Sequence, residues 1–135
     1  MRNFVILILL SFTSACAQHR VQSAQTLLAD QEVRFAFGSA KINGEGKAVL
    51  KNGIEFLKVD LNKAVIIEGH TDKVGSDKSN LDLGDKRARA VKAFLIACGI
   101  EGERITTVTY GESEPKKQLN NYRENRRALL KDLAK

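Results

Sequence analysis

A short apolar run at positions 64–67 constrains the fold more than any other feature of this 135-residue chain. Three of its four residues are β-branched, which favours a strand buried on both faces. The run leads directly into the polar residues His70, Thr71 and Asp72. Polar side chains at the carboxyl end of a buried strand are typical of a binding or catalytic site. The chain is therefore expected to build a sheet around this segment, with its chemistry at one edge.

The residues before this strand predict one more strand and one helix. Apolar and polar residues alternate over 32–37, so Val33, Phe35 and Phe37 are expected on one buried face. Apolar residues then recur at helical spacing over 43–58. The folded part is expected to begin near residue 31 and to form one domain over 31–135.

The residues after the strand continue the alternation. Polar and small residues over 73–82 predict a loop, and the apolar stripe of 85–98, followed by Gly99, predicts a helix. Residues 104–110 predict a third strand, whereas 121–133 fits either a helix or an edge strand. The order β-α-β-α-β plus a terminal element predicts an α+β fold, a mixed sheet with helices packed on one face.

The first residues have the pattern of an export signal. Arg2 supplies a positive charge, residues 4–10 are apolar, and small residues 13–15 follow. The apolar run is too short to span a bilayer, which takes about 20 residues. The alternative is a buried helix or an uncleaved anchor.

Cys16, directly after these small residues, resembles the acylated cysteine of a bacterial lipobox, although Thr13 stands where that pattern favours Leu. We therefore expect a lipoprotein signal over 1–15, acylation of Cys16 and a lipidated tether over 16–30. Cleavage after Ala17, at an A-x-A site, is the alternative and would release a soluble protein.

Composition and spacing argue against several other functions. The net charge is +6, yet the two tyrosines, Tyr110 and Tyr122, are isolated, so a nucleic-acid surface is not expected. His70 lacks zinc partners because the other histidine, His19, lies in the predicted tether. Cys98 is expected as a buried helical thiol. The sequence thus predicts no metal site, no cofactor and no enzymatic activity.

A carboxylate and a guanidinium, Asp72 and Arg87, flank the predicted loop. The carboxylate accepts from an ammonium and the guanidinium offers a planar fork to a carboxylate, so the pair matches a group carrying both charges. Arg87 is expected in the first turns of its helix, where it opposes the helix dipole, which suggests a task for it. The alternative is an internal Asp72–Arg87 salt bridge without a ligand.

Several separated motifs follow one another along the chain. They are Gly-His-Thr-Asp at 69–72, Gly75, Asn80, Leu-Gly-Asp-Lys-Arg-Ala at 83–88, Tyr-Gly-Glu-Ser-Glu-Pro at 110–115 and Asn-Arg-Arg at 125–127. Together these motifs resemble the OmpA-like peptidoglycan-binding domain over about residues 32–130. Within that family, the Leu-Gly-x-x-Arg-Ala and Tyr-Gly-x-x-x-Pro forms are most similar to the peptidoglycan-associated lipoproteins.

The resemblance implies an OmpA-like β-α-β-α-β sandwich whose last strand begins near 125–127. It also implies noncovalent binding of the diaminopimelate of the peptidoglycan stem peptide. The family's first strand usually ends Phe-x-Phe-Asp, and here Gly38 replaces the acid; Ser79 stands where a Tyr is common. The ligand-binding residues carried over from the family are Asp72, Arg87, Thr71, Asn80 and Arg126.

The same resemblance implies a non-catalytic lipoprotein of the outer membrane, on its periplasmic side, that holds the membrane to the cell wall. It implies TolB and other Tol-system proteins as partners. A protein-interaction module of that system without strong wall binding, or a soluble periplasmic peptidoglycan binder, is the alternative. We expect Asp72→Ala and Arg87→Ala each to abolish binding to peptidoglycan sacculi and to leave the fold intact.

Overall fold

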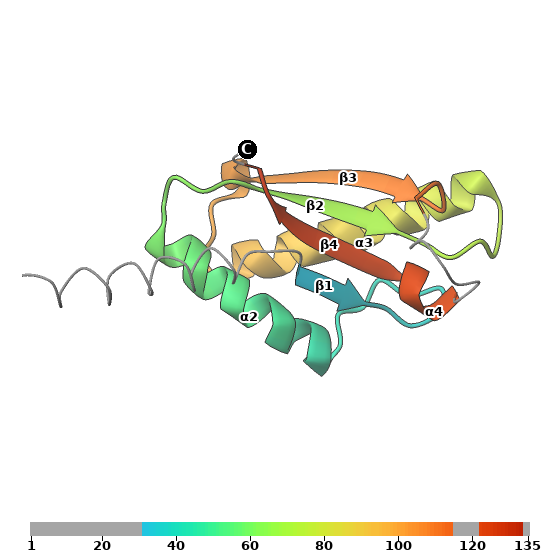
Figure 1. The fold of residues 1–135 in the computed structure, drawn as a ribbon, viewed down its shortest axis with the longest axis horizontal. Helices are drawn as coiled ribbons and strands as arrows, with labels where there is room; N and C mark the ends of the chain where they lie inside the picture. Colours follow the sequence, from blue (N-terminus) through green and yellow to red (C-terminus); the bar gives the residue numbers. More distant parts are fainter. Residues whose placement is uncertain (1–30, 115–121, 134–135) are drawn as a thin grey trace, which may run out of the picture.

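The computed structural model describes residues 31–114 and 122–133, which form a four-stranded sheet flanked by helices (Figure 1). The sheet order is β1-β4-β2-β3, with β2 and β3 parallel and β4 antiparallel to both of its neighbours. The predicted α+β fold with a mixed sheet is confirmed. The strands are β1 (Gln31–Arg34), β2 (Val65–His70), β3 (Ile105–Gly111) and β4 (Arg127–Asp132). The helices are α2 (Gly44–Val59), α3 (Asp77–Ala97) and the single turn α4 (Tyr122–Asn125), with a 3-10 turn at Gly102–Arg104.

One face of the sheet carries the core. Alternate residues of neighbouring strands, such as Val33, Ile67 and Leu130, point to this face and are almost completely buried. Helices α2 and α3 cover it, and their stripes join the strand residues in one continuous cluster. The helices therefore pack on the same face, as the sequence predicts. The helical residues of the cluster are Leu50, Ile54 and Leu57 of α2 and Ala88, Val91 and Leu95 of α3.

Helix α3 begins at Asp77 rather than at residue 85, so the predicted loop is wrong from that residue onward. The Ser76 hydroxyl accepts from the Ser79 N–H at 3.2 Å, and the Ser79 hydroxyl accepts from the Ser76 N–H at 3.1 Å. This reciprocal capping box satisfies two backbone donors that a helix start otherwise leaves unpaired. The serines that suggested a loop therefore start a helix.

Two glycines allow α3 to lie against the end of β2. A side chain at Gly69 would overlap the backbone carbonyl of Gly84, and a side chain at Gly84 would press on the Thr109 hydroxyl. Arg87 follows Gly84 by about one helical turn. The close approach therefore brings its side chain to the carboxyl end of β2.

Strand β1 is shorter than predicted, and β4 lies inside the sheet rather than at its edge. Val33 and Phe35 are buried as expected, but β1 ends at Arg34 and Phe37 is 64% exposed. The segment 121–133, which the sequence left open between a helix and an edge strand, forms a strand inside the sheet, because β4 pairs with β1 on one side and β2 on the other. The start of β4 at Arg127 agrees with the strand that the family resemblance implies near 125–127.

The predicted signal over 1–15 and the tether over 16–30 lie outside the described residues. Within residues 31–114 and 122–133, no helix has the length and hydropathy to cross a membrane.

Candidate functional site

The polar residues after β2 are held in a buried position. The Thr71 N–H donates to the Gly111 carbonyl at 2.8 Å, which extends the contact between β2 and β3 beyond His70. Thr71 and Asp72 are only 2% and 4% exposed. A carboxylate is costly to bury unless it is paired or hydrogen-bonded. The partners of Asp72 therefore define the electrostatics of the site.

Arg87 is completely buried in the middle of α3. Its guanidinium donates to three backbone carbonyls: Nε to Ser39 at 2.9 Å, Nη1 to His70 at 2.8 Å and Nη2 to Ala36 at 3.2 Å. It thereby ties α3 to the segment after β1 and to the end of β2. The expectation that Arg87 lies in the first turns and opposes the helix dipole is wrong, because α3 begins at Asp77.

Gly38 gives the segment after β1 its shape. Its φ is +62°, and the Ser39 N–H donates to the Ala36 carbonyl at 3.2 Å to close the turn. Glycine adopts this left-handed conformation more readily than any other residue. The turn directs the carbonyls of Ala36 and Ser39 at Arg87. Where the family resemblance leads one to expect an acid, this chain has a backbone turn that holds the guanidinium.

Asp72 pairs with an arginine that the sequence did not single out as its partner. Its Oδ1 accepts from the Val74 N–H at 3.1 Å, and its Oδ2 lies 3.4 Å from Nη1 of Arg126. Among the described residues, the ion pair of Asp72 within 4 Å is therefore with Arg126 and not with Arg87. The internal Asp72–Arg87 salt bridge considered from the sequence does not form.

The three charges nevertheless influence one another. Burial lowers the pKa of Arg87 to about 10, an effect that the carboxylate of Asp72 opposes and the cation of Arg126 reinforces. Arg87 stays protonated at neutral pH. The end of β2 therefore gathers two cations and one carboxylate in a buried environment.

Two polar atoms of the predicted site residues have no hydrogen-bond partner among the described residues, the Thr71 hydroxyl and Nε of Arg126. Both are buried. A buried donor or acceptor left unpaired costs roughly 1–3 kcal/mol. A polar ligand that supplied the missing partners would recover this cost.

Asn80 is held by a carboxylate that sequence reasoning left without a role. Its Nδ2 donates to Oε2 of Glu112 at 2.7 Å, and Asn80 is 3% exposed. Because a carboxylate only accepts, Glu112 fixes which end of the Asn80 amide faces it. Asn80 also lies against Gly111, whose carbonyl binds Thr71. Glu112 belongs to the 110–115 motif, which was the available signal.

The five predicted site residues thus lie around the carboxyl end of β2, linked by contacts and by electrostatic coupling. Asp72 reaches Arg126 directly and is coupled electrostatically to Arg87, and Asn80 reaches Thr71 through Gly111. That these residues bind a ligand stays a prediction.

His70 packs against neighbouring strands. It is 1% exposed, stacks on Tyr110 with ring centroids 5.4 Å apart, and has Nε2 3.6 Å from Oε2 of Glu68. Burial, followed by the cation of Arg127, lowers the pKa of His70 to about 4. The imidazole is therefore neutral at physiological pH, and its backbone carbonyl binds Arg87.

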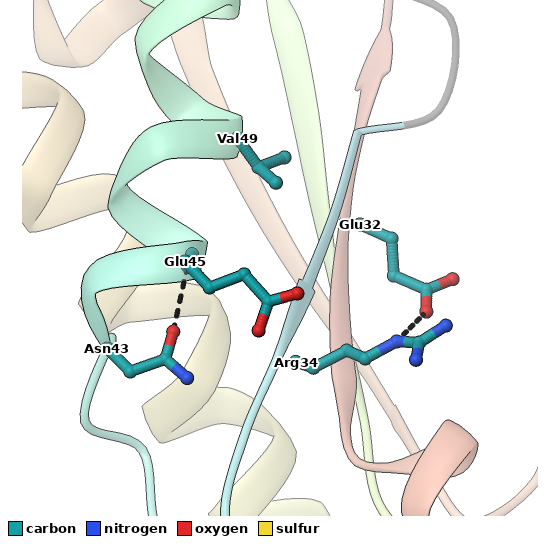
Figure 2. Close-up of a pocket in the computed structure, with 6 residues that line it drawn as sticks. Glu32, Arg34, Asn43, Glu45 and Val49 are labelled. Atoms are coloured by element: carbon teal, nitrogen blue, oxygen red, sulfur yellow. Dashed lines mark hydrogen bonds and ion pairs between the residues drawn. The ribbon is translucent and has the colours of Figure 1, made fainter.

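A groove of about 380 Å³ lies elsewhere, between β1 and the start of α2 (Figure 2). Several of its polar groups are engaged within the domain: the Asn43 side chain accepts from the Gly46 N–H at 2.8 Å, and Nε of Arg34 binds Glu32 at 2.9 Å. None of the five predicted site residues lines this groove, whose lining is Glu32, Arg34, Asn43, Glu45, Gly46 and Val49.

The two cysteines are separate cases. Cys16 lies outside the described residues. Cys98 is half-buried rather than buried and caps the carboxyl end of α3, while Gly99 has a φ of +96° and ends the helix as predicted.

Comparison with known proteins places this architecture in a family. Residues 34–128, which include every predicted ligand-binding residue, match the model of the OmpA family. The peptidoglycan-associated lipoprotein of Buchnera aphidicola subsp. Baizongia pistaciae (strain Bp) is 35% identical over 112 residues, which are 81% of this chain and 65% of that protein. The peptidoglycan-associated lipoprotein of Pasteurella multocida (strain Pm70) is 38% identical over 101 residues, 73% of this chain and 67% of that protein.

A solved structure agrees with the sequence matches. The crystal structure of the peptidoglycan-associated lipoprotein from Burkholderia pseudomallei has a TM-score of 0.72 at 31% identity, covering 78% of this chain and 92% of that chain. The present chain thus has the fold of an OmpA-like domain. It belongs to the OmpA family. It spans about two thirds of the length of the two curated lipoproteins named above.

Proposed function

We propose that this chain is a non-catalytic lipoprotein of the outer membrane that binds peptidoglycan noncovalently through the diaminopimelate of the stem peptide. The observation that carries the proposal is the buried cluster after β2, where Asp72 lies beside Arg126 and within the field of Arg87. The free end of diaminopimelate carries an ammonium and a carboxylate, so it complements such a cluster. The names of the relatives, peptidoglycan-associated lipoproteins, support the same ligand class.

Each predicted residue has a role in this proposal. Asp72 accepts from the ammonium, and Arg126 together with the remaining N–H groups of Arg87 donates to the carboxylate. The unpaired hydroxyl of Thr71 supplies a further polar contact, and Asn80, held by Glu112, borders the same site. The role of Arg87 is partly structural, because its backbone contacts shape the site as well.

The two ends of the sheet suit a tethered binder. Leu130 pairs with both Gln31 and Ile67, so β1 begins level with the middle of β2 and runs in the same direction, toward the site (Figure 1). Asp72 follows Ile67 by five residues, about 16 Å further in this direction at 3.3 Å per residue. A tether from an acylated Cys16 would span at most about 45–50 Å. It would leave the site facing away from the membrane and toward the wall.

The binding site is tested by sedimentation with purified peptidoglycan sacculi. We expect the wild-type protein to pellet and Asp72→Asn to remain in solution, because the amide cannot neutralise an ammonium. Asp82→Asn, which changes the charge equally at an exposed position of α3, is the control and should pellet. Circular dichroism melts establish that all three proteins are folded. Pelleting of Asp72→Asn to the wild-type extent would show that the site is assigned wrongly.

A protein partner on the same side of the domain is a second component of the proposal. Phe37, Val74 and Tyr122 lie in the segments that flank the site and are 64%, 50% and 50% exposed. Exposed apolar side chains around a polar site are typical of protein contacts. We propose TolB or another Tol-system protein as the partner. A pull-down from periplasm with and without added diaminopimelate peptide tests this, and capture that the peptide leaves unchanged would contradict a shared surface.

The anchor and the absence of catalysis have their own tests. Cys16→Ser should remove labelling by radioactive palmitate and release the protein from the outer-membrane fraction, and unchanged membrane association would favour a retained leader helix. Incubation with muropeptides should give no turnover products by chromatography. Accumulation of a cleaved product would overturn the non-catalytic proposal.

A further inference from the structure

The two arginines beside Asp72 are held very differently. Arg87 is completely buried and donates to three carbonyls at 2.8–3.2 Å. Arg126 retains 18% of its side-chain exposure, and its one contact to Asp72 is 3.4 Å long. Optimal charge-assisted pairs of this type lie at about 2.7–2.9 Å. Its Nε is buried without a partner among the described residues. Arg126 is therefore the arginine that can move.

The charge of the cluster limits which ligands it accepts. Two buried or half-buried cations face a single carboxylate, so one positive charge is in excess. A ligand that brought only an ammonium would add a second excess charge at low dielectric. A ligand that also brings a carboxylate leaves the net charge of the cluster unchanged. Its carboxylate can pair with the guanidinium that its ammonium displaces from Asp72. Discrimination between the two kinds of ligand therefore depends on the arginine that the ligand ammonium must displace from Asp72.

We propose that Arg126 is a gate that makes the site specific for a zwitterion. In the free protein Arg126 occupies Oδ2 of Asp72, and the ligand ammonium takes its place. The released guanidinium then binds the ligand carboxylate through Nε and Nη1. This inference rests on the proposed function and adds that Arg126 rejects amines lacking a carboxylate. Arg126 is thus a specificity-determining residue rather than one more favourable contact.

The gate predicts opposite effects on two ligands. The probes are a stem peptide with meso-diaminopimelate and the same peptide with L-lysine, titrated calorimetrically. We expect the wild-type protein to prefer the diaminopimelate peptide at least tenfold. In Arg126→Met, binding of that peptide should weaken by at least tenfold, because its carboxylate loses a partner. Binding of the lysine peptide should strengthen about threefold or more, because its ammonium no longer competes with a guanidinium.

Two further variants separate the gate from a structural role. Arg126→Lys keeps the cation beside Asp72 and should keep rejecting the lysine peptide. Arg89→Met removes the same charge from an exposed position of α3, where 73% of the side chain is accessible, and should bind both peptides like the wild type. In the wild type, the Nε–H resonance that Arg126→Met removes should shift when the diaminopimelate peptide is added.

The outcomes distinguish this inference from the proposed function. If the wild type binds neither peptide, the proposed function fails and the gate fails with it. If the wild type discriminates but Arg126→Met weakens both peptides equally, the site stands and the gate is refuted. Unchanged affinities in Arg126→Met refute the gate as well.

Discussion

Replacement of Arg87 by alanine tests whether this residue stabilises the fold by tying α3 to the segment after β1 and to the end of β2. The substitution leaves three carbonyls, those of Ala36, Ser39 and His70, without their donor. Each hydrogen bond to a charged group contributes about 1.5–3 kcal/mol, but losses at one site are not additive. A buried acceptor left without its donor costs about 1–3 kcal/mol. We therefore expect Arg87→Ala to lower the free energy of unfolding by at least about 3 kcal/mol.

The effect is measurable by thermal and urea unfolding. For a domain of about 100 residues, each 1 kcal/mol shifts the Tm by about 4–8 °C, so the expected loss is about 12 °C or more. Arg87→Lys should not rescue the Tm, because one ammonium cannot reach three carbonyls in separate segments. Arg89→Ala, at an exposed position two residues on, should cost less than about 0.5 kcal/mol.

A Tm of Arg87→Ala within about 3 °C of the wild type would refute this reasoning, since that is less than 1 kcal/mol. The prediction departs from what the sequence led us to expect, namely that Arg87→Ala leaves the fold intact. A loss of sacculus binding by Arg87→Ala is therefore not a clean measure of ligand contact. Asp72→Asn, which keeps the size of the side chain, is the better probe.

Two further predictions concern stability. Gly69→Ala should destabilise the domain by at least about 2 kcal/mol in urea unfolding, because its Cβ would overlap the Gly84 backbone. Gly44→Ala is the control: it has nothing within 4 Å of its Cβ and should be neutral or stabilising by up to about 1 kcal/mol. Equal Tm values for the two variants would contradict the close approach of α3 to β2. The folded-state pKa of His70, about 4, lies below its ordinary value of 6.5, so the unfolded chain binds the proton more readily. The neutral imidazole stabilises the fold fully above pH 6.5, and this stabilisation, up to about 3 kcal/mol, is lost as the pH falls toward 4. His70→Gln should remove the loss, which urea unfolding at pH 7, 5.5 and 4 would measure. A wild-type stability that stays flat over this range would contradict the buried, neutral state.

Local patterns predicted most elements because each reports its own periodicity. The alternation over 32–37 and the helical spacing of Val49, Leu50, Ile54 and Leu57 indicated which residues face the core. The structure buries most of them but leaves Val49 partly exposed. The errors came where local signals compete with tertiary contacts. Phe37 continues the alternation, but the turn at Gly38 takes it out of the sheet, and Ser76 and Ser79 resemble loop residues until they cap each other.

Residue types and motifs located the candidate site, but they did not indicate which side chains contact one another there. The sequence alone located a carboxylate after a buried strand and a guanidinium after the following loop. It could not show that Arg87 donates hydrogen bonds to the carbonyls of Ala36, Ser39 and His70, since these contacts join residues far apart in the chain. Nor could it show that Arg126 reaches Asp72, because this requires β4 to insert beside β2.

The sequence by itself therefore determined the class of fold, the position of the site at the end of 64–70 and the charges available there. Periodicity and residue type are local properties, and local properties suffice for these conclusions. Only the tertiary structure decided the strand order and which arginine pairs with Asp72. Both follow from packing between distant segments. Gly69 and Gly84 allow α3 to pack against β2, and the buried carbonyls there accept hydrogen bonds from Arg87, which does not pair with Asp72.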